Sequence, residues 1–207
     1  MKQTRIKICG ITTVADGIAA AEAGADAVGF VFYPKSPRYV DPAKVAEIVS
    51  ALPPFVTTVG LFVNAAPEFV NETLAVAPLN LLQFHGDESE TYCRQFDRPY
   101  IRAARVRPEL DLIQYAASFS SAQAILLDAY VEGYGGGGHA FDWNLIPTEL
   151  ARPIVLSGGL TVDNVTEAVR RVRPAAVDVS SGVEISKGVK DHAKIAAFIA
   201  GVRNADV

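Results

Sequence analysis

Cysteine is scarce in this chain, and neither sign of charge dominates. The 207 residues include 2 cysteines, Cys9 and Cys93, too few for a disulfide framework or a cysteine-rich zinc site. Lys and Arg total 19 against 23 Asp and Glu; the resulting net charge of −4 argues against non-specific nucleic-acid binding, which needs a basic stripe. No apolar run reaches the ~18 residues that span a bilayer, and the N-terminus lacks a signal-peptide core. We therefore expect a cytoplasmic protein with no nucleic-acid or membrane partner.

The chain instead alternates short β-branched runs with helical segments of period 3.6. Its hydrophobic fraction of 50% and charged fraction of 20% are typical of a compact globular protein. The expected strands are Arg5–Cys9, Ala27–Phe32, Thr57–Val63, Asn80–Phe84, Pro99–Ala103, Ala124–Asp128, Pro153–Ser157 and Val177–Ser180. The expected helices are Thr13–Ala23, Pro42–Ser50, Ala66–Val76, Ser89–Gln95, Pro108–Ser118, a short one near Trp143–Leu150, Val162–Val172 and His192–Arg203.

These eight strand–helix units follow one another with no linker between them. Repeated units of this kind imply parallel strands joined by right-handed crossovers, and eight of them permit closure. The sequence therefore predicts an α/β protein, a single (β/α)8 barrel domain over residues 1–207 with eight parallel strands. A doubly wound open sheet is the alternative, and the absence of G-x-G-x-x-G after the first strand weakens its dinucleotide-binding form. Active sites of barrels lie at the carboxyl ends of the strands, so the strand ends hold the candidate residues.

Cys9 ends the first expected strand. Because side chains alternate along a strand, Lys7 and Cys9 face the barrel interior and Ile6 and Ile8 face the helices. Cysteine acts as a base or nucleophile only as the thiolate. Position alone leaves a buried structural cysteine as an equal alternative. Cys93 falls on a helix, where we expect it only to pack.

Asp128 ends the sixth expected strand, in the run AILLDAY, where alternation puts it on the same side as Leu126, with Ile125 and Leu127 on the other side. An acid at the end of an apolar strand is costly to bury without a partner or a purpose. Burial raises the pKa of a carboxylic acid, and an acid that is still protonated near neutral pH can donate a proton. The alternative is a structural pair with Lys7 or with a helix N-terminus.

Glycine and serine follow the last two expected strands, in the runs SGGL and SSG. Glycine lets backbone N–H groups approach an anion, and serine hydroxyls add donors. Barrels often hold phosphate at the loops after strands 7 and 8, so we predict a phosphate site, with two tight turns as the alternative. The predicted phosphate-binding residues are Gly158, Gly159, Ser180, Ser181 and Gly182. Asp178 also faces inward, where it would bind sugar hydroxyls or pair with Lys7.

Three further features are weaker signals. Arg38 lies with Lys35 in a proline-flanked loop and could clamp a substrate carboxylate, or it could belong to a solvated basic loop. His85 ends the fourth strand and could line the site, or it could be a hydrogen-bonded rim histidine. The glycine-rich run at positions 133–139 is interpreted as a lid or hinge, with disorder as the alternative. The three histidines have no metal-ligand spacing, so we expect no metal.

Taken in order, the strand-end motifs resemble a known family over nearly the whole chain. They are KICGIT beginning at Lys7, GFVFYPKSPRYV at Gly29–Val40, then VGLFVN, LLQFHGDE, LLDAY, FDWN, LSGGL, DVSSGVE and GVKD. In this order they are similar to phosphoribosylanthranilate isomerase of tryptophan biosynthesis. The family usually has a threonine in the run before FDW, where this chain has Gly137, and this departure predicts a more mobile lid.

The resemblance implies a cofactor-free and metal-free Amadori rearrangement of N-(5′-phosphoribosyl)anthranilate. It implies that Cys9 is the general base, Asp128 the general acid and Arg38 the partner of the anthranilate carboxylate. Lys7, His85 and Asp178 are expected at the substrate, and the SGG and SSG loops at the phosphate. The rivals are an epimerase, whose metal-binding histidines and aspartates are missing here, a histidine-pathway isomerase with aspartate in place of Cys9, and a non-catalytic phosphometabolite-binding barrel. Monomer and homodimer are both compatible with the sequence.

Overall fold

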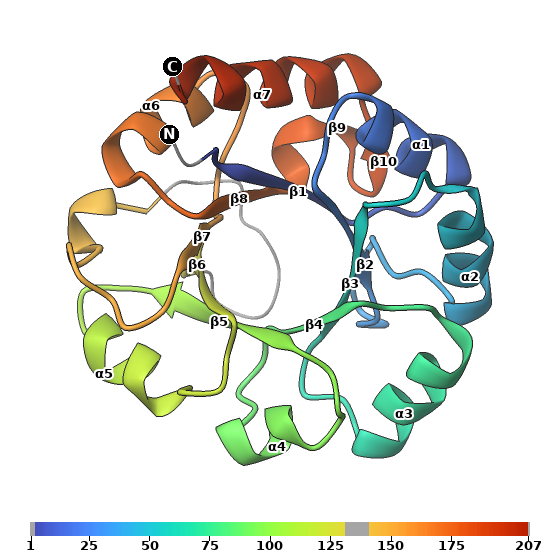
Figure 1. The fold of residues 1–207 in the computed structure, drawn as a ribbon, viewed down its shortest axis with the longest axis horizontal. Helices are drawn as coiled ribbons and strands as arrows, with labels where there is room; N and C mark the ends of the chain where they lie inside the picture. Colours follow the sequence, from blue (N-terminus) through green and yellow to red (C-terminus); the bar gives the residue numbers. More distant parts are fainter. Residues whose placement is uncertain (1–2, 131–140, 207) are drawn as a thin grey trace.

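A computed structural model of the chain describes residues 3–130 and 141–206. Eight parallel strands pair in sequence order, and the last pairs with the first to close a barrel (Figure 1). The strands are β1 (Arg5–Cys9), β2 (Ala27–Val31), β3 (Thr57–Phe62), β4 (Leu81–Phe84), β5 (Tyr100–Val106), β6 (Ala124–Ala129), β7 (Ile154–Leu156) and β8 (Ala176–Val179). The predicted (β/α)8, or TIM-barrel, architecture is confirmed.

The helices surround the barrel as an outer ring (Figure 1). Within the described residues they are α1 (Val14–Glu22), α2 (Pro42–Ala51), α3 (Pro67–Val76), α4 (Glu90–Arg94), α5 (Leu112–Ser118), α6 (Val165–Val172) and α7 (His192–Ala205). Between β6 and β7 the expected short helix near Trp143–Leu150 is wrong, because only the 3-10 turn η1 (Trp143–Leu145) forms. Pro147 explains the difference, since it disfavours helical backbone at the preceding residue, and Ile146 is extended.

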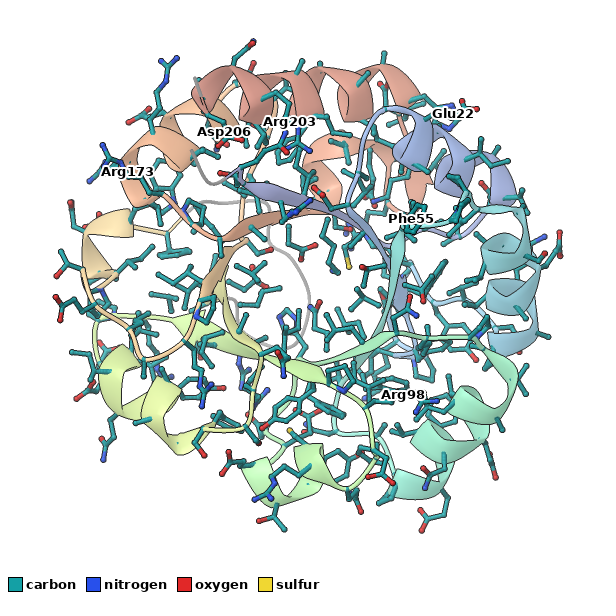
Figure 2. The ribbon with its side chains drawn as sticks, in the orientation of Figure 1. Glu22, Phe55, Arg98, Arg173, Arg203 and Asp206 are labelled. Atoms are coloured by element: carbon teal, nitrogen blue, oxygen red, sulfur yellow. The ribbon has the colours of Figure 1, made fainter. Side chains whose placement is uncertain are left out.

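Side chains of the strands alternate between two separate cores. Ile6 and Ile8 belong to the large outer core between strands and helices, together with Cys93. A smaller cluster fills the inside of the barrel with Ile101, Ala103, Ala124, Leu126 and Val155. Figure 2 shows side chains directed into the centre of the barrel from the ring of strands. The predicted inward and outward faces of the first and sixth strands are therefore confirmed.

One small element departs from the repeating pattern. The segment that joins β8 to α7 contains a second 3-10 turn, η2 (Ser181–Val183), and a two-stranded antiparallel sheet of β9 (Glu184–Ser186) and β10 (Val189–Lys190). The sequence analysis did not predict this hairpin. Its position after β8 places it at the end of the barrel where the candidate site residues lie.

The end of α7 closes onto the start of β1. Asp206 accepts hydrogen bonds from the backbone N–H and the hydroxyl of Thr4, at 3.1 and 2.7 Å. Arg203 donates to the Thr4 carbonyl at 2.7 Å, and Figure 2 shows Arg203 and Asp206 together beside the start of β1. These bonds join residues about 200 positions apart, so they fasten the last helix to the first strand.

Replacing Asp206 with alanine is expected to destabilise the protein without affecting catalysis. The change leaves a backbone N–H and a hydroxyl without their partner, which costs about 1–3 kcal/mol of unfolding free energy. Urea denaturation measures the loss. Glu22→Ala, an exposed acid at the end of α1, is the matched control and is expected to change the value by less than about 0.5 kcal/mol. Equal stability of the two variants would contradict the fastening role.

No helix in the described part of the chain is both long and apolar enough to cross a membrane.

Candidate active site

A pocket opens at the carboxyl ends of the barrel strands. Nine of the eleven predicted site residues line it: Cys9, Arg38, His85, Asp128, Gly158, Gly159, Asp178, Ser180 and Ser181. Lys7 and Gly182 lie close to it without lining it. Residues from strands that are distant in sequence thus meet at one opening, as the strand-end argument predicted.

Cys9 lines the pocket next to a buried ion pair. Lys7, one inward position before Cys9 on β1, is 5% exposed, and its Nζ lies 2.8 Å from Asp178 Oδ1. Burial raises the pKa of the Cys9 thiol, and the positive charge of Lys7 acts in the opposite direction. Burial alone would lower the pKa of Lys7, but Asp178 and Cys9 together raise it to about 12. Lys7 therefore stays charged near neutral pH and favours the thiolate of Cys9.

The guanidinium of Arg38 is turned toward a neighbouring acid. Its Nε and Nη2 donate to the two carboxylate oxygens of Glu184, at 2.7 and 2.8 Å. The same carboxylate accepts from Lys190 Nζ at 2.9 Å. Hydrogen bonding to Glu184 raises the pKa of Arg38. Burial on its own would raise the pKa of Glu184, but the two cationic partners, Arg38 and Lys190, lower the pKa of Glu184 below its usual value. Glu184 occupies the Nε–Nη2 edge of the guanidinium. A substrate carboxylate would therefore have to bind Arg38 through Nη1, and not through the bidentate contact that the sequence analysis predicts.

Asp128 reaches the pocket from β6, with β7 and β8 between it and Cys9. Its Oδ1 accepts from the Ala129 N–H at 2.9 Å, and its Oδ2 lies 3.0 Å from His85 Nε2. The other ring nitrogen of His85, Nδ1, lies 3.0 Å from the amide nitrogen of Gln83. Asp128 is thus not the partner of Lys7; its hydrogen-bond partners are His85 and the Ala129 N–H.

The two loops predicted to hold phosphate lie side by side. Gly158 and Gly159 have φ angles of 77° and 65°, and a Cβ on Gly158 would collide with the Ala129 backbone nitrogen, so glycine is required there. Gly182 packs against the carbonyl oxygen of Leu160, which draws the second loop onto the first. Gly182 therefore shapes the site by close backbone approach and does not line it. The other four predicted loop residues, Gly158, Gly159, Ser180 and Ser181, line the pocket.

Sequence reasoning missed three polar residues at the site. Glu184 and Lys190 come from the β9–β10 hairpin and hold Arg38 and the Ser180 carbonyl in place, with Lys190 Nζ 3.0 Å from that carbonyl oxygen. Gln83 lines the pocket from β4. Its signal was available, because a glutamine at an inward position, two residues before His85, interrupts an otherwise apolar strand.

Two other expectations concern the lid and metals. The predicted lid, including Gly137, lies outside the residues that the structure describes. Over residues 3–130 and 141–206, no three His, Cys, Asp or Glu side chains gather into a group that could hold a metal ion.

A closed barrel with a thiol and a carboxylate across its mouth and glycine–serine loops after β7 and β8 defines a class, the phosphate-binding (β/α)8-barrel enzymes that use acid–base chemistry. The family described as N-(5′-phosphoribosyl)anthranilate (PRA) isomerase matches residues 6–201. The chain belongs to this family of isomerases of tryptophan biosynthesis.

Individual relatives agree with this placement. The chain is 67% identical to N-(5′-phosphoribosyl)anthranilate isomerase of Dechloromonas aromatica over 204 residues, covering 99% of this chain and 98% of the relative. It is similar to the crystal structure of phosphoribosylanthranilate isomerase from Thermotoga maritima, with TM-score 0.90, 45% identity and coverage of 98% and 100%. A further isomerase structure, at TM-score 0.84, 41% identity and the same coverage, is a complex with reduced 1-(o-carboxyphenylamino)-1-deoxyribulose 5-phosphate.

Proposed function

We propose that this chain catalyses the Amadori rearrangement of N-(5′-phosphoribosyl)anthranilate to 1-(2-carboxyphenylamino)-1-deoxyribulose 5-phosphate, with Asp128 as general acid and Cys9 as general base. The observation that carries the assignment is that both side chains face one pocket from strands separated by β7 and β8. An acid and a base so placed can act on neighbouring atoms of a single sugar held between them. The chemistry requires only proton transfers.

The first step opens the ribose ring. Asp128 donates its proton to the ring oxygen, and the ring C–O bond breaks as the aniline nitrogen forms a double bond to C1′. The products are an iminium ion and a ring-opened hydroxyl, and Asp128 becomes a carboxylate. His85 Nε2 and the Ala129 N–H, at 3.0 and 2.9 Å, are placed to stabilise that carboxylate.

The second step removes the proton on C2′. The Cys9 thiolate takes this proton, and the electrons of the C–H bond neutralise the iminium to give an enolamine. Tautomerisation then moves the hydroxyl proton on C2′ to C1′ and yields the ketone. One proton passes from Cys9 to Asp128 through solvent and restores both groups. Lys7, whose ammonium stays charged, is the residue that favours the thiolate.

The remaining site residues position the substrate. The phosphate is held at Gly158, Gly159, Ser180 and Ser181, and Gly182 keeps the two loops together. The anthranilate carboxylate contacts Arg38 through Nη1, the part of the guanidinium that Glu184 leaves open. Lys7 and Asp178 bond to each other, at 2.8 Å, so their effect on the substrate passes through Cys9 and through the shape of the pocket. Fixing both ends of the substrate brings its reacting carbons to the acid and the base.

Neutralising the buried ion pair is expected to shift the pH dependence of catalysis. Lys7→Met combined with Asp178→Asn removes both charges, and Lys7 acts on Cys9 more strongly than Asp178 does. The pKa of Cys9 therefore rises further, and the increase of kcat/KM with pH moves to higher pH. The exposed pair on α2 supplies the matched control, Lys44→Met with Glu47→Gln. Superimposed pH profiles for the two double variants would contradict the role of Lys7.

The function is tested in a coupled assay. Anthranilate and phosphoribosyl pyrophosphate are joined by their transferase, and the fluorescence of phosphoribosylanthranilate is followed when the chain is added. We expect the fluorescence to decay faster than the spontaneous breakdown of the substrate, and the ketose phosphate to appear in the same amount. A decay no faster than the spontaneous rate at micromolar enzyme would overturn the proposal.

Three organisational proposals accompany the function. We propose that residues 1–207 belong to a single domain, and we therefore expect one cooperative unfolding transition. We expect a reducing, cytoplasmic location for a protein whose two cysteines are both free thiols. We expect the chain to act as a monomer or a homodimer on a small-molecule substrate, without nucleic acid or membrane. Denaturation curves, cell fractionation and analytical ultracentrifugation test these points in turn.

A further inference from the structure

Gln83 holds an unusual position behind the candidate acid. It is fully buried on β4 and faces the barrel interior, and its amide nitrogen lies 3.0 Å from His85 Nδ1. Its carbonyl oxygen Oε1 is buried and has no hydrogen-bond partner among the described residues. Leaving a buried acceptor unpaired is destabilising, so an unpaired Oε1 calls for an explanation.

The hydrogen bonds that link Gln83, His85 and Asp128 depend on one another. An amide nitrogen can only donate, so His85 Nδ1 must accept from Gln83. A neutral imidazole that accepts at Nδ1 carries its proton on Nε2. That Nε2–H then donates to Asp128 Oδ2, 3.0 Å away, which requires Asp128 to accept. The arrangement seen in the structure therefore suits Asp128 as a carboxylate, the state after it has given up its proton.

Turning the Gln83 amide by half a rotation reverses every donor and acceptor. The carbonyl oxygen then accepts from Nδ1–H, and the free lone pair on Nε2 accepts from a protonated Asp128. This second arrangement suits Asp128 as the acid, the state before the reaction. Over residues 3–130 and 141–206, no second partner on the far side of the amide fixes one orientation, because the group opposite the amide nitrogen is the unpaired Oε1.

We propose that Gln83 and His85 are positioning residues that keep Asp128 hydrogen-bonded in both of its protonation states, the Gln83 amide turning and the His85 tautomer changing as Asp128 loses and regains its proton. No proton passes through the amide, and the bonds made and broken are hydrogen bonds only. The unpaired carbonyl oxygen is then the consequence of an amide that must be free to turn. This inference rests on the proposed role of Asp128 as general acid.

The decisive variant is Gln83→Glu. A carboxylate at this position can only accept, so it fixes a proton on His85 Nδ1 and favours the doubly protonated ring. The Nε2–H then donates to Asp128 permanently and holds it as the carboxylate. We expect the single-turnover rate, with enzyme in excess, to fall about tenfold or more near neutral pH. We also expect the pH above which this rate declines to move down, with little change in KM.

Two further variants separate this role from a structural one. Gln83→Met keeps the approximate volume but releases His85, so we expect a smaller loss of rate and no shift of the declining limb. Gln114→Glu, at an exposed position on α5, adds the same charge away from the site and is expected to match the unaltered chain. Equal pH profiles for Gln83→Glu and the unaltered chain would overturn the proposal. An equal loss in Gln83→Met and Gln83→Glu, with no shift in either, would also overturn it.

A spectroscopic measurement tests the inference without activity. Long-range ¹⁵N–¹H correlation spectra identify which nitrogen of His85 carries the proton, and His85→Asn assigns the signal among the three histidines. We expect the Nε2–H tautomer when Asp128 is ionised and the Nδ1–H tautomer when Asp128 is protonated, compared over a series of pH values. An Nδ1–H tautomer at all pH values would overturn the proposal. If the coupled assay shows no isomerisation, the proposed function fails, while the tautomer result is still measured.

Discussion

Cys9→Ser is expected to lower kcat by about 10²–10⁴-fold with the fold intact, the scale of a lost general base. Serine is close to cysteine in size and suits the space beside Lys7, but its hydroxyl is far less acidic than a thiol. The thiolate is the form that removes the C2′ proton, and burial already opposes it by raising the pKa of Cys9. The positive charge of Lys7 offsets part of the effect of burial on the pKa of the thiol. The pKa of an alcohol is so much higher that the same charge leaves serine protonated.

Steady-state kinetics in the coupled assay measure this effect, with circular dichroism as the test of folding. The matched control is Cys93→Ser, which makes the same atomic change in the outer core on α4, away from the pocket. The control is expected to keep kcat within about threefold of the unaltered chain. It is also expected to lose some stability, because the new hydroxyl is buried without a hydrogen-bond partner. A Cys9→Ser variant that kept kcat as well as the control does would exclude Cys9 as the base.

The pH dependence of the unaltered chain carries the same argument. Because burial raises the pKa of Cys9, the thiolate fraction in the empty site grows as the pH rises above neutral. We therefore expect kcat/KM to rise with pH over that range. Cys9→Ser is expected to lose this rise along with most of the rate.

The sequence predicted those parts of the site that depend on local periodicity. Alternation along β1 and β6 was enough to turn Cys9 and Asp128 inward, and the order of the units was enough to place their strand ends at one mouth. The loops after β7 and β8 could likewise be located from glycine and serine alone. Each of these inferences uses residues a few positions apart, for which strand geometry is a sufficient guide.

The parts it could not predict depend on contacts between distant segments. The loop around Arg38 contains no acidic residue that the sequence would pair with it. Its bidentate partner Glu184 is 146 residues away, on a hairpin that the sequence analysis did not predict. The sequence left Asp178 either to pair with Lys7 or to bind sugar hydroxyls. The register of β1 against β8 places Asp178 directly beside Lys7, and the two side chains pair. The helix expected near Trp143–Leu150 does not form for a local reason, because Pro147 disfavours helical backbone at Ile146.

These distant pairings leave a single positive charge unbalanced among five charged side chains at the mouth of the barrel before substrate arrives. Lys7 is matched by Asp178, while Arg38 and Lys190 share Glu184. Such paired charges cannot drift toward solvent, so the groups that meet a phosphate and a carboxylate are already fixed in position. Preorganised charges of this kind stabilise a transition state without reorganising during the reaction.

Asp128→Asn is expected to lower kcat by about 10²–10⁴-fold and to leave KM within about tenfold. The asparagine has nearly the same shape: its one oxygen can still accept from the Ala129 N–H, and its amide nitrogen can donate to His85 Nε2 when the His85 proton is on Nδ1, so the pocket and the substrate-binding loops keep their geometry. What it loses is the ability to give a proton to the ring oxygen. Ring opening then depends on water, and the large effect on kcat with a small one on KM marks a group that acts in the transition state.

The matched control for this substitution is Asp97→Asn. Asp97 is exposed on the loop between α4 and β5, at the opposite end of the barrel, and has a φ of 48°. Asparagine tolerates this left-handed conformation well, so the control is expected to keep both stability and activity. If Asp128→Asn retained kcat within about tenfold while Cys9→Ser was inactive, the proton would have to come from another group. His85, 3.0 Å from Asp128, would then be the acid that protonates the ring oxygen, in place of Asp128.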